Sequence, residues 1–98
     1  QAADTKRLME ASYEQKVALI ENYRRLITII RSNLHYYDEL IRATEAAVKA
    51  GYKAGYDLQT LQNSRAIEEL EIKINDLNIQ IELAALYYQM RHPQEPSL

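Results

Sequence analysis

Both glycines of the 98-residue chain fall in one stretch, Ala50-Gly51-Tyr52-Lys53-Ala54-Gly55-Tyr56-Asp57, and this stretch decides the fold. Neither glycine nor proline occurs in residues 4–50 before it or in residues 58–90 after it. Glycine readily takes the left-handed backbone conformation that ends helices, so the stretch is typical of a break between two helices. We therefore expect a helix over 4–50, a turn over 51–57 and a second helix over 58–90.

The ends of these helices carry their own signals. Asp4 or Thr5 is expected to cap the first helix and Asp57 the second, since short polar side chains accept hydrogen bonds from free backbone N–H groups. Gly55 is expected to be a second pivot of the turn. Prolines at 93 and 96 stop regular structure, which leaves residues 91–98 as a tail.

The composition favours an all-α fold. With two glycines, two prolines and no Cys, Trp or Phe, the chain has few residues for the turns of a sheet, and helix-favouring residues dominate it. A net charge of −2 without a basic cluster argues against nucleic-acid binding. The longest apolar run, residues 83–88, is too short to cross a membrane. Because the chain starts with Gln and shows no signal segment, it is expected to be processed or excised from a longer protein.

Apolar residues of the first helix repeat every seven positions, as in a coiled coil. Two seam positions are filled by Tyr13, Ile20, Ile27, Leu34, Ile41 and Val48, and by Met9, Tyr23, Ile30 and Tyr37. Adjoining positions are also apolar, namely Leu19, Leu26, Leu40 and Ala47 on one side and Leu8, Ile29, Tyr36 and Ala43 on the other. This stripe is wider than a single partner helix covers.

The second helix carries two apolar stripes. One contains Ile67, Leu70, Ile74, Leu77, Ile81, Ala84 and Tyr88, and the other Ile72, Ile79 and Leu86. Polar residues between them, Glu68, Glu71, Asn75, Asn78 and Glu82, are expected to face solvent. We expect a long antiparallel two-helix coiled-coil hairpin that self-associates into a helical bundle, because the wide first-helix stripe and the Ile72/Ile79/Leu86 stripe otherwise face water.

The unequal helix lengths predict an overhang. About 46 residues before the turn face about 33 after it, so the first helix extends past the second by about 13 residues, roughly 20 Å. Leu8, Met9 and Tyr13 fall in this overhang, which further chain is expected to cover.

Catalytic chemistry has little support in the sequence. His35, Asp38 and Glu39 share one helical face and could offer a divalent metal one nitrogen and two oxygens, but no second His or Cys closes the site. A solvated charged surface is the favoured interpretation, with Asp38 spaced for an ion pair with Arg42. No nucleophile–base grouping or phosphate-binding loop is present. We expect no enzyme, no cofactor and no metal.

Eight tyrosines stand in a chain without Phe or Trp. Tyrosine suits surfaces that are half interface and half wet, because its ring packs while its hydroxyl reaches water. Coiled-coil packing accounts for several of them. Tyr52 and Tyr56 lie in the turn, where there is little core to fill, so they are candidates either for simple packing or for contacting a partner or forming a gate.

The turn and its flanks resemble the TolC family of outer-membrane efflux proteins. The resemblance is carried by an Ala-rich helix end and a Gly-Tyr-x-x-Gly turn, residues 46–55, followed by Asp57-Leu58-Gln59-Thr60-Leu61-Gln62-Asn63-Ser64-Arg65. Residues 13–26 and 83–88 resemble the descending and ascending helices of the hairpin. The match covers nearly the whole chain but only the periplasmic hairpin of the family's second repeat.

The resemblance implies a trimeric exit duct that works with a periplasmic adaptor protein and an inner-membrane pump. This chain would be a periplasmic part of an outer-membrane protein and would not itself contact the membrane. The tip residues Gly51, Tyr52, Lys53, Ala54, Gly55, Tyr56 and Asp57 would then bind the adaptor, with Tyr52 as the gate residue. Where the family carries acidic residues that ring the entrance, this chain has Gln59 and Gln62.

A second function class uses the same heptads without a duct. A structural or signalling coiled-coil hairpin, such as a periplasmic adaptor arm, also needs two long helices and apolar stripes. The Gly-Tyr-x-x-Gly turn favours the efflux interpretation. The transported substrate and the pump type have no signature in these residues.

Overall fold

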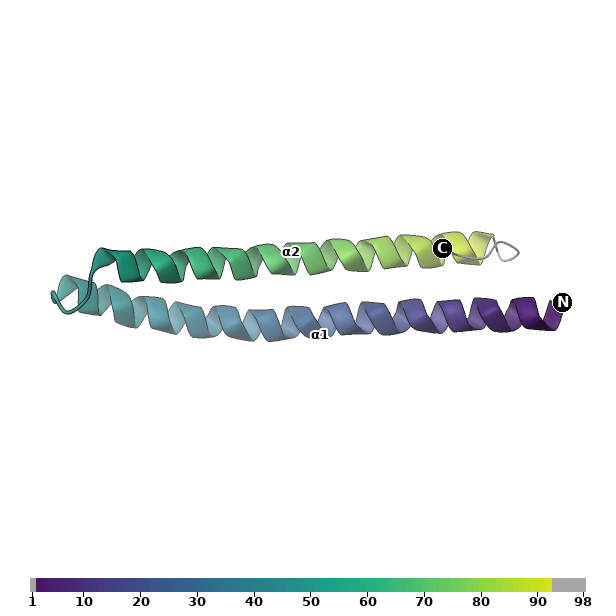
Figure 1. Cartoon of the computed structure of the whole chain (residues 1–98), viewed down its shortest axis with the longest axis horizontal. Coiled ribbons are helices and arrows are strands. Elements are labelled where there is room, and N and C mark those ends of the chain that lie inside the picture. The colour runs from purple at the N-terminus through teal and green to yellow at the C-terminus, as the bar shows by residue number, and fades with distance from the viewer. Residues whose placement is uncertain (1, 93–98) are drawn as a thin grey trace. The chain divides into compact units, whose positions relative to one another are not determined.

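The computed structural model describes residues 2–92, and within this range it contains two helices and no strand. Helix α1 spans Ala2–Lys49 and helix α2 spans Gly55–Arg91; Figure 1 shows both. The predicted all-α fold is confirmed. Helix α2 begins at Gly55 rather than at residue 58 and continues through Arg91, while residues 93–98 of the expected tail lie outside the described residues.

The chain divides into two compact units. The turn unit is residues 26–74, and the terminal unit combines residues 1–25 with 75–98, described over 2–25 and 75–92. In each unit a segment of α1 packs beside a segment of α2, and the two segments run in opposite directions (Figure 1). The predicted antiparallel helical hairpin is therefore confirmed.

The turn is fixed by backbone hydrogen bonds at the end of α1. The Tyr52 N–H donates to the Ala47 carbonyl at 2.8 Å and the Gly51 N–H donates to the Val48 carbonyl at 3.0 Å. These two bonds form a Schellman motif, which needs a left-handed residue after the helix. Gly51 supplies it with a φ of 83°. Gly55 is not a second pivot, because it is the first residue of α2 and has no positive φ.

The predicted caps are wrong at both helix starts. Helix α1 already begins at Ala2, so Asp4 lies inside its first turn, where its carboxylate pairs with Arg7. At the start of α2, the Asp57 N–H donates to the Ala54 carbonyl at 3.1 Å, and Asp57 lies within the first helical turn. Both carboxylates stabilise the positive ends of the helix dipoles rather than cap them.

Each unit has a small core between α1 and α2. Ile20, Ile79 and Leu86 are buried in the terminal unit, and Ile27 and Ile30 are buried in the turn unit. The α1 members of this core all belong to the heptad seam predicted for the first helix. That seam is therefore the inner face of α1.

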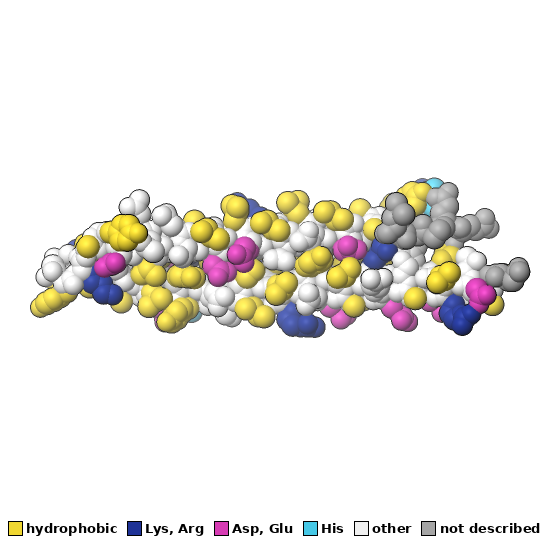
Figure 2. Space-filling view, in the orientation of Figure 1, with side chains coloured by type: hydrophobic (Ala, Val, Ile, Leu, Met, Phe, Trp, Pro, Cys, Tyr) yellow, Lys and Arg dark blue, Asp and Glu magenta, His cyan; other side chains and the backbone are white. Residues whose placement is uncertain are grey.

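The inner face of α2 is the stripe that was expected to face water and to drive self-association. Ile79 and Leu86 are buried and Ile72 is half-buried, so this stripe packs on α1 instead of facing water. The stripe with more apolar residues, here called the richer stripe, is exposed instead: Ile67 62%, Leu70 57%, Ile74 50%, Leu77 62%, Ile81 62% and Tyr88 49%. Figure 2 shows hydrophobic side chains on the visible surface of both helices.

Polar residues of α2 decide this pairing. Glu68, Asn75, Asn78 and Glu82, expected to face solvent, are half-buried beside the inner stripe, whereas Glu71 is exposed. Two α2 side chains, those of Arg65 and Gln89, form hydrogen bonds to α1 from this face. The inner face thus combines apolar burial with polar bonds to α1.

The predicted overhang includes Met9 and Tyr13 wrongly, because α2 reaches both residues. The Gln89 amide donates to the Met9 carbonyl at 2.9 Å, so α2 reaches this residue. The reason is that α2 has 37 residues rather than the expected 33 or so. Leu8 is 71% exposed.

Candidate functional site

The tip of the turn unit presents two tyrosines to solvent. The Tyr52 side chain is 86% exposed and the Tyr56 side chain 77% exposed. Tyr52 follows Gly51 in the Schellman motif, so its backbone is held by the hydrogen bond to the Ala47 carbonyl while its side chain is exposed. Tyr56 lies in the first turn of α2, where its carbonyl accepts a hydrogen bond from the Thr60 hydroxyl at 3.0 Å.

The other predicted tip residues are brought together on the same short connection. Gly51, Lys53, Ala54, Gly55 and Asp57 are all exposed. One cation and one anion therefore accompany the two phenols, a mixed surface that offers aromatic contact area together with hydrogen-bond donors and acceptors. Such a surface suits contact with another protein.

Gln59 and Gln62, which replace the acidic residues of the resemblance, are exposed in the first turns of α2. Neutral amides accept and donate hydrogen bonds but do not attract cations as a carboxylate ring does. A cation-sensitive entrance is therefore not expected from these two positions.

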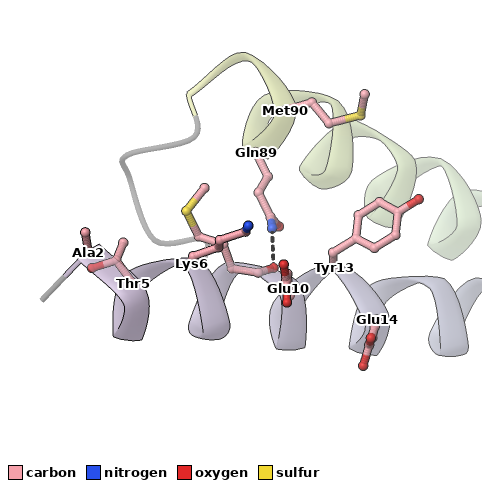
Figure 3. A pocket seen from close by; sticks show the side chains of 9 residues that line it. Ala2, Thr5, Lys6, Glu10, Tyr13, Glu14, Gln89 and Met90 are labelled. Atoms are coloured by element: carbon pink, nitrogen blue, oxygen red, sulfur yellow. Dashed lines mark hydrogen bonds between the residues drawn. The ribbon is translucent and has the colours of Figure 1, made fainter.

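A buried polar cluster joins the helices in the terminal unit. Gln89 and Lys16 are each 7% exposed. The Gln89 amide donates to the Met9 carbonyl at 2.9 Å (Figure 3). The Gln89 side-chain oxygen accepts from the Ser12 hydroxyl at 3.4 Å. Lys16 Nζ donates to Ser12 Oγ at 3.0 Å, which completes a chain of polar contacts across the interface.

Beside this cluster lies an open groove of about 750 Å³. Its lining comes from the start of α1 and the end of α2: Ala2, Thr5, Lys6, Met9, Glu10, Tyr13, Glu14, Gln89 and Met90. Figure 3 shows the Tyr13 ring directed toward α2 and the Glu14 carboxylate directed away from it. The groove is mostly apolar, so it suits packing against another apolar surface.

An ion pair joins α1 and α2 in the turn unit. Arg65 Nε donates to Asp38 Oδ1 at 2.6 Å and Arg65 Nη2 donates to Asp38 Oδ2 at 3.3 Å, a two-point contact, and Arg65 also pairs with Glu69. The hydrogen bond from Arg65 lowers the pKa of Asp38 below its usual 3.8. The same bond raises the pKa of Arg65. The direct ion pair of Asp38 is thus with Arg65 of α2, whereas the charge of Arg42, the expected partner, makes a smaller contribution to lowering the Asp38 pKa.

This ion pair also occupies the carboxylate of Asp38, which was one of the three candidate metal ligands. His35 Nε2 lies 3.9 Å from Glu39 Oε1 on an exposed surface, while the Asp38 carboxylate is engaged by Arg65. Within residues 2–92, no group of three or more His, Cys, Asp or Glu side chains is placed to hold a metal ion.

Sequence reasoning missed the polar cluster, although a signal for it exists. Lys16 and Thr44 occupy the same heptad position as Met9, Tyr23, Ile30 and Tyr37. Both are buried, with exposed fractions of 7% and 5%. A polar residue in an otherwise apolar seam position marks a place where the partner helix must supply a matching polar group.

Over the described residues, neither helix is both long enough and apolar enough to span a membrane. No family model, no curated protein and no solved structure matches this chain.

Proposed function

We propose that this chain is a periplasmic tunnel segment of an outer-membrane efflux duct of the TolC type, with its turn as the gate and the adaptor-docking tip. The observation that carries the proposal is the tip itself. A Schellman turn at Gly51 joins two long antiparallel helices and leaves Tyr52 and Tyr56 almost fully exposed. The resemblance of residues 46–65 to the family's turn is the sequence counterpart of this geometry.

The surface of the helices supports a place in a wall of helices. In such a wall each helix contacts a neighbour on either side, so it needs apolar residues on more than its hairpin face. Helix α1 exposes Leu8 at 71%, Ile29 at 51% and Tyr36 at 61%, all from one heptad position. Helix α2 exposes its richer stripe. Both helices therefore have apolar surface that neighbouring hairpins of a trimer would cover.

The tip supports docking and gating. An exposed phenol offers a ring for contact with a partner and a hydroxyl for one neutral hydrogen bond. Bonds of this kind are weak enough for the binding of an adaptor to break them. The proposed partners are two further copies in the complete trimer, a periplasmic adaptor protein and an inner-membrane pump. The proposal assigns the chain no catalytic residue, metal or cofactor, and no nucleic acid.

The test uses the complete protein that contains this chain, expressed in a Gram-negative host with its own adaptor and pump. A photo-crosslinking amino acid at position 52 is compared with one at position 36, which is exposed on α1 away from the tip. We expect the protein in the outer-membrane fraction as a trimer, with adaptor crosslinks from position 52 that exceed those from position 36. A cytoplasmic or inner-membrane location would refute the proposal.

The exposed stripe of α2 favours a second candidate function, a structural or signalling coiled-coil hairpin such as a periplasmic adaptor arm. Its Ile and Leu heptads are typical of direct helix pairing and need no duct. The same fractionation separates the two, because an adaptor arm is attached to the inner membrane or is free in the periplasm.

A further inference from the structure

Helix α2 buries its poorer face and exposes its richer one. We define the outer stripe as Ile67, Leu70, Ile74, Leu77, Ile81, Ala84 and Tyr88. Its large side chains are between 49% and 62% exposed. In the turn unit it comprises the residues up to Ile74, and in the terminal unit those from Leu77 onward. A surface helix normally turns its apolar face inward, so this helix has an apolar face that the hairpin leaves without cover.

The order of residues in the outer stripe specifies the kind of helix that fits it. Ile occupies the first seam position in three successive heptads, at 67, 74 and 81, and Leu occupies the second at 70 and 77. Ile at the first position with Leu at the second favours a parallel two-stranded coiled coil, because the two side-chain shapes pack best in that geometry. The partner with the same spacing and length is α2 of another molecule.

The charges beside the outer stripe are compatible with a second copy. One flank carries Ala66, Lys73 and Gln80, and the other carries Glu71, Asn78 and Ala85. In a parallel pair in register, each residue of the first flank faces the residue five positions later in the partner. Ala66 then faces Glu71, Lys73 faces Asn78 and Gln80 faces Ala85. No two like charges meet in these pairs, so charge repulsion does not oppose a parallel pair in register.

We propose that the outer stripe of α2 packs against the same stripe of a second copy of this chain, as a parallel two-stranded coiled coil in register. The pairing concerns the chain by itself. In the proposed duct the same stripe would contact neighbouring hairpins instead, so the two arrangements exclude each other. The pairing adds an interface between copies to the interface within the hairpin, and these two interfaces lie on different faces of α2.

Sedimentation of the 98-residue chain tests the pairing. At about 50 µM we expect a dimer, twice the 11.4 kDa chain mass. The double substitution Ile74→Glu and Leu77→Glu should weaken the dimer about 100-fold or more, because two apolar contacts are replaced by charges that repel across the interface. Both side chains are at least 50% exposed, so the hairpin should keep its helical circular dichroism.

The matched control is Ile29→Glu, which places the same charge at a 51% exposed isoleucine on α1, outside the outer stripe. This variant should dimerise like the parent. A monomeric parent chain would overturn the proposal. A double variant that dimerises as tightly as the parent would overturn it too.

Disulfide trapping tests the orientation, and the chain has no cysteine of its own to interfere. In a parallel pair in register, the two copies of residue 77 face each other, so Leu77→Cys should oxidise rapidly to a covalent dimer. Asp76→Cys, one residue away and exposed outside the stripe, is the control and should crosslink at least tenfold more slowly. Equal rates for the two cysteines would contradict the parallel register.

Discussion

Gly51 and Gly55 lie four residues apart, yet the fold uses them differently. At both positions an added Cβ would meet no atom within 4 Å, so steric crowding does not explain why the two glycines differ. What differs is the backbone: Gly51 has a φ of 83°, a conformation that a side chain disfavours, whereas Gly55 is an ordinary helical residue. The effect of a substitution is therefore set by conformation and by the entropy of the unfolded chain.

From this difference we expect opposite effects of the same substitution. Gly51→Ala should lower the free energy of unfolding by about 1–2 kcal/mol, because alanine is strained in the left-handed region. Gly55→Ala should raise it by about 0.4–1 kcal/mol, because alanine restricts the unfolded chain and fits a helix. Thermal melting followed by circular dichroism measures both, and shifts of equal sign would contradict the assigned backbone conformations.

Asp38 makes a pH-dependent contribution to stability. Its pKa in the folded chain is lowered by the hydrogen bond from Arg65, so the folded state binds a proton less readily than the unfolded state. The resulting stabilisation is fully present above the usual value of 3.8 and is lost as the pH falls through the lower folded value.

We therefore expect Asp38→Asn to lower the urea midpoint at pH 7, and we expect this effect to shrink as the pH falls below 3.8 and through the lowered folded-state pKa of Asp38. The control is Asp76→Asn, which removes the same charge from an exposed position on α2. An effect that does not shrink as the pH falls would mean that Asp38 acts through packing or through a neutral hydrogen bond.

At the scale of the helices, polar contacts set which faces meet. The terminal unit has a short apolar core, Ile20, Ile79 and Leu86, beside the buried side chains of Lys16 and Gln89. Gln89 is bonded to α1 at two points, whereas the charged Lys16 amine has a hydrogen bond to the Ser12 hydroxyl. A buried cation beside a neutral group gains less than it loses in hydration.

Two substitutions in this cluster should act in opposite directions. Gln89→Ala should cost about 1–3 kcal/mol, because it removes both bonds to α1 and opens a gap. Lys16→Met should raise stability by about 1 kcal/mol, because an apolar side chain of similar length replaces a buried charge. Urea unfolding gives the values, and Gln80→Ala on the exposed side of α2 is the control. A loss of stability in Lys16→Met would show that the amine is needed to hold Ser12 and Gln89.

The sequence was sufficient for the helices and for the turn, because the two glycines stand between long segments of helix-favouring residues. The inner face of α1 was also predictable, since its seam contains the buried Ile20, Ile27 and Ile30. The inner face of α2 was not, because heptad counting weighs apolar residues alone. The packed face contains Arg65 and Gln89, whose bonds to α1 depend on the register of the two helices. The tip was predictable as a turn, and the exposure of its tyrosines follows from the short connection.

At the scale of the whole molecule, opening of the proposed duct would depend on Tyr52, which symmetry repeats in each subunit of the trimer. Tyr52 is 86% exposed, so within one chain its hydroxyl makes no demand on the fold. In a trimer, three such hydroxyls would meet near a three-fold axis. Each neutral hydrogen bond contributes about 0.5–1.5 kcal/mol, so three bias a closed entrance by a few kcal/mol. A binding partner can reverse a bias of this size.

The complete protein with Tyr52→Phe should therefore open more readily. Phenylalanine keeps the ring and removes the hydroxyl, so the substitution isolates the hydrogen bond from the packing of the ring. In a planar bilayer we expect higher conductance or more frequent opening than in the parent, with trimer stability unchanged, since the exposed side chain supports no core. Tyr36→Phe, which removes the hydroxyl of a 61% exposed tyrosine on α1, should leave conductance unaltered. Parental conductance in Tyr52→Phe would take this residue out of the gate and leave it as a docking contact. That result would agree with the presence of Gln59 and Gln62 in place of acidic residues. The tip would then have neither a tyrosine hydrogen bond nor a ring of carboxylates to hold an entrance closed.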